Sequence, residues 1–519
     1  MTIKRYHANS DNTITNAYES NFVTRGTGSN MGAADILEVF SIWGQQSSGS
    51  SELSRILINF PITNITTDRS NSSIPGSGSV DFYLKLFNAP HSQTVPKNMT
   101  MLVSAVSRSW EEGTGLDMDN YTDLTYDSIS GSNWMNASSS ATSVTPWTNF
   151  GGDYHTDTSS SFTVDFDTGL ENLELNITSL VEQWADSSGN ILGSKPQYGV
   201  LIALTGSQEA SSSFANIGGV PENASGAKKS YYTKKFFGRT SEFFFKRPYI
   251  EARWDSSIKD NRGNFYRSSS LASSDDNLHT LYLYNYVRGQ LKNIPTRDPG
   301  TTTVNVRLYT SASGKETILT PVLSKSIAGA AVSPVNNVVT GGYAGSTGIY
   351  SATFALNTTY ETVYDRWFGA SETETNVYHT GSFSVKKLDS SPINPNQKYV
   401  TSIPNLKSSY SRQENARFRL FIRKKDWTPT IYTHATTEPE TEIVEDVYYK
   451  VARVRDRTTV IDYGTGSLNH TRLSYDISGS HFDLDMSLFE PGYAYELNFV
   501  YYLNGAYHEQ PEKFKFKVE

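Results

Sequence analysis

The chain has 519 residues, of which 37% are hydrophobic and 19% charged, and its formal net charge is −8. An acidic chain gains no counterion-release attraction to nucleic acid, so we expect no nucleic-acid partner. Cysteine is absent, which excludes disulfides, thiolate metal sites and a cysteine nucleophile.

The first residues include two basic side chains, Lys4 and Arg5, but no apolar run follows them, so a signal peptide is not expected. A helix that crosses a membrane needs about 18 consecutive apolar residues, and the sequence contains no such run. We therefore expect a soluble protein that is made without conventional secretion and does not insert into a membrane.

Short strands with one apolar face are predicted through residues 1–255. Apolar residues recur at every second position, which is typical of strands that bury one face and leave the other in water. Turns rich in Gly, Ser and Asn separate the strands, as in a β-sandwich. Four sets of residues have this spacing: Ile56, Ile58 and Phe60; Phe82, Leu84 and Leu86; Phe162, Val164 and Phe166; Leu173, Leu175 and Ile177.

One short helix is predicted over Ser179–Asp186. Ser179 and Glu182 have the spacing of a capping box, in which the serine oxygen accepts an early backbone N–H and the glutamate reaches back. Leu180 and Trp184 then fall on one face at helical spacing. We expect this helix to close one end of the sandwich and to be nearly the whole helical content.

Five motifs follow one another in this region: a strand with Arg and Phe, a Trp-Glu-x-Gly turn, Trp before Gly-Gly-Asp, a Thr-Ser-Leu-Val-x-x-Trp helix and a Tyr-Gly strand. In this order they resemble the DNRLRE-type module, a β-jelly roll classed among carbohydrate-binding modules. A long insertion between Trp110 and Trp147 and an extra segment, Gly206–Tyr232, depart from that pattern, so sugar binding does not transfer with the fold. The matching residues are Arg55, Phe60, Trp110, Glu111, Glu112, Gly113, Trp147, Gly151, Gly152, Asp153, Thr178, Ser179, Leu180, Val181, Trp184, Tyr198 and Gly199.

Two further sandwiches are predicted after a polar linker, Ser256–Ser274. The first contains Gly348-Ile-Tyr-Ser-Ala-Thr-Phe354, which resembles a strand of immunoglobulin-like domains, and Asp365–Gly369, which is predicted to be a turn with a buried Trp. After a second linker, Asp389–Asn396, a Leu-Phe-Glu-Pro-x-x-x-Tyr495 run resembles the tyrosine corner of fibronectin-like sandwiches. The predicted class is all-β: a jelly-roll sandwich (residues 1–255), an immunoglobulin-like β-sandwich (256–388) and an immunoglobulin- or fibronectin-like β-sandwich (389–519).

An acidic run is the candidate metal site. Asp117, Asp119 and Asp123 place several carboxylates within reach of one cation, and calcium prefers six to eight oxygen ligands. The EF-hand pattern is not met, because its glycine and its final glutamate are missing. The alternative is a solvated insertion loop without a metal.

Two aromatic groups are candidate binding sites. Trp134 and Trp147 flank a serine-rich loop and could stack on sugar rings, although Trp147 would pack in the core if the jelly-roll resemblance holds, which leaves Trp134 the freer ring. The second group is a basic aromatic cluster. It fits nucleic-acid stacking less well than a contact with an acidic subunit or a plain exposed hairpin, because the whole chain is acidic. Its residues are Lys228, Lys229, Tyr231, Tyr232, Lys234, Lys235, Phe236 and Phe237.

A catalytic signature is missing from the sequence. No nucleophile elbow, phosphate-binding loop or His-Glu-x-x-His occurs, and Glu111 and Glu112 are adjacent, so on a strand they face opposite sides. Glycosidase carboxylates come from distant segments, so the sequence does not exclude such an enzyme. The prediction is nevertheless a protein that is not an enzyme and needs no cofactor, with calcium as the one alternative.

Two C-terminal segments, Phe421–Trp427 and Leu473–Phe489, resemble segments of marine phage virion proteins. With the tandem sandwiches, this resemblance predicts a structural protein of a tailed-bacteriophage virion, in the tail, the neck or on the capsid. Its partners would be other virion proteins, copies of itself and a host-surface glycan, and its location would be the virion after synthesis in the host cytoplasm. The other hypotheses are a free carbohydrate-binding adhesion protein and a depolymerase.

If Asp117, Asp119 and Asp123 bind calcium, removal of calcium should lower the melting temperature of the first domain, because a bound ligand stabilises the native state by mass action. The measurement is a thermal melt in saturating calcium and in chelator. Equal melting temperatures in the two conditions would rule out the site.

Overall fold

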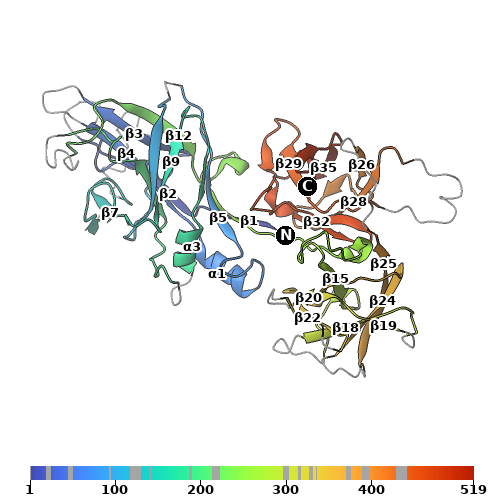
Figure 1. The fold of residues 1–519 in the computed structure, drawn as a ribbon. Helices are drawn as coiled ribbons and strands as arrows, with labels where there is room; N and C mark the ends of the chain where they lie inside the picture. Colours follow the sequence, from blue (N-terminus) through green and yellow to red (C-terminus); the bar gives the residue numbers. More distant parts are fainter. Residues whose placement is uncertain are drawn as a thin grey trace. The chain divides into compact units, whose positions relative to one another are not determined.

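The computed structural model describes residues 2–18, 25–44, 51–92, 95–116, 130–140, 142–185, 190–212, 223–295, 303–313, 317–325, 331–332, 334, 336–369, 374, 376–387, 397–427 and 441–519. The chain divides into two compact units, Thr2–Asp255 and Ser256–Glu519 (Figure 1). Both units are built almost entirely from strands, so the predicted all-β sandwich class is confirmed.

The first unit is a sandwich of two antiparallel sheets. Its four-stranded sheet has the order β1 (Ile3–His7), β13 (Tyr249–Arg253), β5 (Asp81–Leu86) and β10 (Leu173–Asn176). Its seven-stranded sheet has the order β12 (Tyr231–Phe237), β3 (Ile36–Trp43), β4 (Ser51–Asn59), β11 (Val200–Leu204), β6 (Met99–Ala105) and β9 (Ser161–Phe166), and β2 (Ser10–Thr15) also pairs with β4.

The core lies between these sheets and contains the alternating residues that the sequence singled out. Ile56 and Ile58 of β4 and Phe82 of β5 are fully buried in one cluster, together with Leu84 and Leu86. Each fully buried side chain of this size contributes roughly 1.5–3 kcal/mol of hydrophobic stabilisation. The period-two pattern therefore identified the inward face of these strands correctly.

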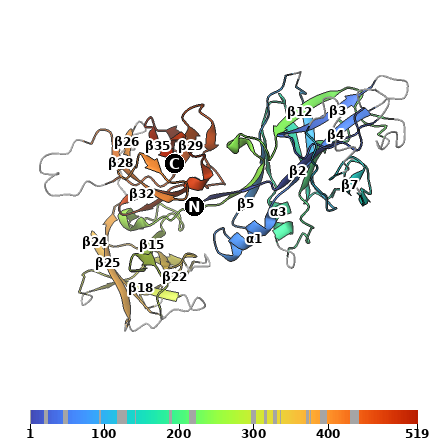
Figure 2. The same ribbon diagram turned by 180° about the vertical axis from the view of Figure 1, so that it is seen from behind.

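Two helices cover one end of this sandwich, α1 (Ile62–Ser70) and α3 (Thr178–Ala185), and they lie side by side in both views (Figures 1 and 2). The predicted helix is confirmed as α3, but α1 was missed. The sequence of α1, ITNITTDRS, is rich in β-branched residues and buries only Ile62 and Ile65, so it carries no strong helical periodicity. No helix among the described residues has the length and apolarity needed to cross a membrane.

The predicted capping box of α3 is wrong. The Ser179 hydroxyl donates to the Ser159 carbonyl (2.9 Å) instead of capping the helix. Glu182 accepts from the Arg69 guanidinium of α1 (2.8 Å for one of the two contacts) instead of reaching back to its own helix. Both side chains are therefore used for tertiary contacts, which outweigh the local motif.

Among its described residues, the second unit contains three larger sheets, one two-stranded sheet and two 3-10 turns. Its ten-stranded sheet has the order β14 (Phe265–Tyr266), β25 (Val377–Lys386), β24 (Thr362–Phe368), β18 (Thr303–Tyr309), β22 (Val339–Tyr343), β23 (Ile349–Ala355), β20 (Leu323–Lys325) and β21 (Ala331–Val332), with β15 (His279–Tyr284) on β23 and β19 (Ile318–Leu319) on β18. A four-stranded sheet follows with the order β26 (Tyr399–Ser402), β28 (Asn415–Lys424), β32 (Gly479–Asp485) and β31 (Ser474–Asp476). The six-stranded sheet has the order β27 (Ser409–Tyr410), β35 (Phe514–Val518), β33 (Ala494–Leu503), β29 (Val447–Arg453) and β30 (Thr459–Ile461), with β34 (Ala506–Glu509) on β33. The remaining elements are β16 (Tyr286–Val287), β17 (Gln290–Leu291) and the 3-10 turns η2 (Asn261–Gly263) and η3 (Met486–Leu488), whereas the 3-10 turn η1 (Phe244–Lys246) belongs to the first unit.

Two predictions for this unit need correction. Asp365–Gly369 is not a turn, because residues 362–368 form strand β24, although the predicted aromatic anchor Trp367 is indeed fully buried. Ser256–Ser274 is not a simple polar linker, because Asp260 and Phe265 within it are buried. The second predicted linker, Asp389–Asn396, and the boundary at residues 388 and 389 lie outside the described residues.

The segment Ser256–Ser274 forms a joint, because its side chains are hydrogen-bonded to strands of two different sheets of the second unit. Asn261 donates from Nδ2 to the phenol oxygen of Tyr475 in β31 (3.0 Å). Its neighbour Arg262 donates through both terminal nitrogens to the buried carboxylate of Asp365 in β24 (2.6 and 2.7 Å). The polar character that made this segment look like a linker is thus used to satisfy buried groups.

The tyrosine corner is present. The phenol of Tyr495 donates to the carbonyl of Glu490 (2.8 Å) and accepts from the backbone N–H of the same residue (3.0 Å). A tight hairpin turn follows on the same strand: Leu503 pairs with Ala506, and Asn504 and Gly505 between them have positive φ, as a type I′ turn requires.

We expect Tyr495→Phe to destabilise the C-terminal sandwich by about 1–3 kcal/mol, because the backbone groups of Glu490 lose a buried partner. Chemical denaturation followed by tyrosine and tryptophan fluorescence measures the loss. Tyr502→Phe is the matched control, since Tyr502 lies on the same strand with an exposed ring. Equal stability of the two variants would contradict the role given to the Tyr495 phenol.

Candidate functional site

The outer face of the seven-stranded sheet is covered, which the period-two pattern did not predict. Residues 106–116 and 130–154, with 141 outside the described part, form a loop layer that contains the hairpin β7 (Asn136–Ser139) and β8 (Val144–Pro146). Leu53 and Leu57 of β4 and Leu201 of β11 pack with Trp134 and Trp147 of this layer in a second core. The expectation of a solvated outer face for β4 is therefore wrong.

Trp134 lies in this second core, so the expectation that it is the freer ring is also wrong. It is 0% exposed and Trp147 is 3% exposed, and the Trp147 indole donates to the Asn133 carbonyl (2.9 Å). Trp110 is half-buried and donates to the Tyr198 carbonyl (2.8 Å). In this arrangement the Trp134 and Trp147 rings are packed against the protein and offer no open face to a sugar.

A buried arginine of the sheet, paired with Glu209, anchors the loop layer through its contacts with Gly151 and Trp134. Arg55 of β4 donates to the Glu209 carboxylate (2.9 to 3.1 Å) and to the Gly151 carbonyl (3.1 Å), and its guanidinium lies 5.3 Å from the Trp134 ring centre. Burial lowers the pKa of Arg55, but the Glu209 charge, Tyr154 and the hydrogen bond to Glu209 together outweigh it, so the pKa lies above its usual value. Gly151 has φ +83°, and a Cβ there would lie 2.9 Å from both Arg55 and Trp134. This close packing explains why residue 151, in the stretch after Trp147, is a glycine.

The basic aromatic cluster does not form one surface. Lys228 and Lys229 are exposed, and Lys235 pairs with Glu38 of the neighbouring strand (2.7 Å). Lys234 instead points inward and is 0% exposed. Tyr231 is likewise buried whereas Tyr232 is exposed. The expectation of a continuous exposed basic hairpin is wrong, because the strand alternates between the core and solvent.

Asp117, Asp119 and Asp123 lie outside the described residues, so the acidic-run prediction stays a prediction. Among the residues that are described, no group of three or more His, Asp or Glu side chains is arranged to hold a metal ion. No cofactor site is assigned.

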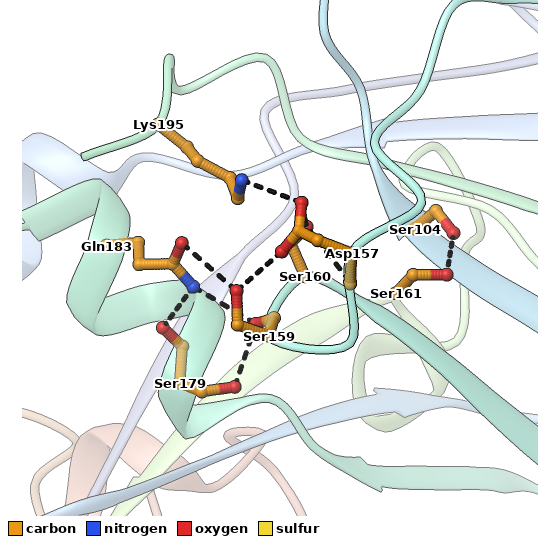
Figure 3. A network of polar contacts seen from close by, with 8 residues as sticks. All are labelled: Ser104, Asp157, Ser159, Ser160, Ser161, Ser179, Gln183 and Lys195. Atoms are coloured by element: carbon orange, nitrogen blue, oxygen red, sulfur yellow. Dashed lines mark hydrogen bonds and ion pairs between the residues drawn. The ribbon is translucent and has the colours of Figure 1, made fainter. Parts of the chain in front are cut away.

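A polar network joins the turn before β9 to helix α3 (Figure 3). Asp157 is its centre: the carboxylate accepts from the hydroxyls of Ser159 (2.5 Å) and Ser160 (2.9 Å) and from the ammonium of Lys195 (2.9 Å). Gln183 of α3 donates from Nε2 to the Ser159 carbonyl (3.0 Å). Beside it, the hydroxyls of Ser104 and Ser161 meet across β6 and β9 (2.7 Å).

This network fixes a turn and is poorly arranged for nucleophilic catalysis. The hydrogen bonds from Ser159 and Lys195 lower the pKa of Asp157, so its carboxylate is ionised and a weak base. A serine nucleophile needs a neighbouring base such as histidine, which is itself oriented by a third group. Here the Ser159 hydroxyl donates its hydrogen bond directly to the Asp157 carboxylate. His155 is nearby, but its Nε2 is buried without a hydrogen-bond partner among the described residues.

Sequence reasoning missed the residues that meet at Lys234. Asn88, Gly169 and Glu171 surround its side-chain nitrogen, and they come from turns far away in the chain. One signal was available: Lys234 and Phe236 are two residues apart on a strand, so if Phe236 faces the core, Lys234 does as well.

Comparison with known proteins adds no family to this geometry. No protein-family model matches the sequence, and the search of curated proteins found no match.

We expect Arg55→Met to destabilise the first unit by about 3–5 kcal/mol, because Glu209 is left as a buried charge without its partner. Glu209→Gln should have a smaller cost, and the double variant should recover part of the loss. Denaturant unfolding measures all three free energies. Lys235→Met is the control, because its pair with Glu38 is partly exposed and worth about 0–1 kcal/mol. Equal costs for Arg55→Met and Lys235→Met would contradict the anchoring role.

Proposed function

We propose that the chain is a structural protein of a tailed-bacteriophage virion, a tail, neck or capsid-associated component that has no catalytic activity and docks in several copies on the particle. Two sequence segments support the phage assignment by resemblance, Phe421–Trp427 and Leu473–Phe489. The tandem β-sandwich architecture supports a structural role, since such units give reach and rigidity.

The observation that carries the proposal is that the buried charged side chains described above are paired with other groups of the same chain. The largest charged and hydrogen-bonded groups described above, Arg55 with Glu209, Arg262 with Asp365 and the Asp157 network, join strands and turns of the chain itself. Because these side chains are paired within the chain, they stabilise its fold. We take this use of charged side chains as support for a structural role.

A tyrosine surface on the C-terminal sandwich supports docking. Tyr502 of β33 and Tyr507 of β34 are 41% and 47% exposed, and their ring centres are 4.8 Å apart. Tyr448 backs this pair, 6.1 Å from Tyr507. Tyrosine is enriched where proteins dock, because its ring buries apolar area while its hydroxyl still bonds to a partner. We assign this face to a neighbouring virion subunit.

The second candidate is a free carbohydrate-binding adhesion protein. The same exposed rings of Tyr502 and Tyr507 favour it, since sugars stack on aromatic faces. The burial of Trp134 and Trp147 argues against sugar binding on the first unit. The two candidates differ in where the protein is found and in what the tyrosine pair contacts.

The proposal predicts that an antibody against this chain labels purified phage particles at regular positions in electron microscopy. The isolated full chain should release no sugar from surface polysaccharides. A protein that is missing from particles and cleaves a polysaccharide would overturn the proposal.

A Tyr502→Ala, Tyr507→Ala variant should be incorporated into particles several-fold less than the wild type while it keeps its fold. Tyr360→Ala is the matched control, because Tyr360 is 48% exposed and belongs to the other part of the second unit. Normal incorporation together with lost retention on a host-glycan column would favour the carbohydrate-binding alternative.

A further inference from the structure

A buried lysine meets a carboxamide in the first unit. Lys234 of β12 is 0% exposed, and its Nζ lies 2.5 Å from Asn88 Oδ1, 2.7 Å from the Gly169 carbonyl and 2.9 Å from the Glu171 carbonyl. Lysine is almost never fully buried unless its charge is paired. Here every oxygen in contact with the nitrogen belongs to an uncharged group.

Burial raises the share of uncharged amine at Lys234, although the ammonium still predominates at pH 7. The rings of Phe166 and Phe236 lie 5.2 and 5.0 Å from Nζ. Burial lowers the pKa of Lys234 to about 8, although the Glu171 charge partly opposes that shift. With that pKa, Lys234 is a free amine in about a tenth of the molecules at pH 7. A desolvated lysine in an apolar pocket is an activated nucleophile.

Asn88 is held firmly against this amine. It follows β5 of the opposite sheet, its backbone pairs with Phe236, and its N–H donates to Asn172 Oδ1 (2.8 Å). Ala89 next to it donates to the Lys235 carbonyl (3.0 Å). Backbone contacts to the two residues that follow Lys234 therefore hold the Asn88 backbone beside this amine, which reduces the entropy cost of a reaction between the two side chains.

A third group is placed to assist at the carbonyl. His91 Nε2 lies 3.1 Å from Asn88 Oδ1. When Nε2 carries the ring proton, it donates to the oxygen on which negative charge develops during attack. The carboxylate of Glu171 is close enough to affect Lys234 electrostatically, and its Oε2 has no hydrogen-bond partner among the described residues. Burial raises the pKa of Glu171, but hydrogen bonds from Thr168 lower it to about 2, so the carboxylate stays charged beside Lys234 and the proton of the attacking nitrogen goes to the leaving group instead.

We propose that Lys234 and Asn88 react to form an intramolecular amide bond between Nζ and Cγ. The neutral Lys234 amine adds to Cγ, the new C–N bond forms, and the bond from Cγ to Nδ2 breaks. The leaving nitrogen takes up a proton from Nζ and departs as ammonia, which is ammonium at neutral pH. No oxidant or other reactant is consumed. Asn88 is half-buried, so the released ammonia has a route to water.

The bond would join the two sheets of the sandwich. Lys234 belongs to the seven-stranded sheet, and Asn88 directly follows a strand of the four-stranded sheet. A cross-link between positions far apart in sequence stabilises mainly by restricting the unfolded chain, as a disulfide does. In a chain without cysteine, this reaction supplies the same kind of constraint and is insensitive to reductant.

Intact-mass spectrometry of the denatured full-length protein tests the proposal. The expected mass is lower than the encoded mass by one ammonia, and a protease digest should yield one branched peptide that contains both Asn88 and Lys234. A wild-type mass equal to the encoded mass, with both residues in separate peptides, would overturn the proposal and leave Lys234 as a hydrogen-bonded ammonium.

Four variants separate this bond from other losses of ammonia, such as cyclisation of another asparagine. Lys234→Arg keeps the charge and should have the full encoded mass, and Asn88→Ala should as well. Asn88→Asp keeps the reaction and should lose one water instead of one ammonia, which gives a readout even if Asn88→Ala does not fold. Lys235→Arg, the neighbouring lysine, should still lose one ammonia. A loss of ammonia that persists in Lys234→Arg would overturn the proposal.

A time course gives the kinetic test. After refolding, the loss of ammonia should follow the return of structure and should be several-fold slower in His91→Ala than in the wild type. The cross-linked wild type should also melt at a higher temperature than Lys234→Arg. A Lys234→Arg variant that melts at the wild-type temperature and is also one ammonia lighter than its own encoded mass would contradict the bond.

Discussion

A charge taken out of water must find a partner inside the protein, and this requirement organises the structure. On the four-stranded sheet of the first unit, the Glu251 carboxylate accepts from Arg5 and Arg253, both at 2.7 Å. Burial raises the pKa of Glu251, but the two arginines lower it to about 2, so the carboxylate stays charged. Buried ion pairs of this kind select one arrangement of the strands, because a hydrophobic core alone tolerates many arrangements. The pairs of Glu251 with Arg5 and of Glu209 with Arg55 tie together segments that are distant in the sequence.

The inward faces of the strands were predictable from the sequence because alternation is a local property. Ile56, Ile58 and Phe82 needed only their own neighbours to be assigned to the core. The tyrosine corner at Tyr495 was likewise contained in a few consecutive residues. The fold class follows from repeated patterns of this kind, and that is why it could be read from one chain.

The candidate sites were harder, because their environment comes from elsewhere in the chain. Trp134 is buried by residues of β2, β4 and β11 that no local pattern connects with it. Lys234 looked like part of a basic run, since four lysines lie within eight residues, and only the fold separates it from Lys235. Helix α1 was missed for the related reason that its stability comes from packing on α3, where Arg69 meets Glu182. In each case a tertiary contact outweighed the local sequence.

The joint around Asn261 has a consequence for how the protein is made. Asp260 donates its N–H to the Tyr475 carbonyl (3.0 Å), and Tyr475 donates its own to the Ile258 carbonyl (3.0 Å). Residues near position 260 leave the ribosome long before residue 475 is translated. The first unit can therefore complete its sandwich during synthesis, in the usual order of domain folding. The joint must wait, with its polar groups still hydrated, until residue 475 has emerged. A nascent chain that stalls between these two points would leave the polar groups around Asn261 in water, so the start of the second unit completes its structure only after β31 has been made.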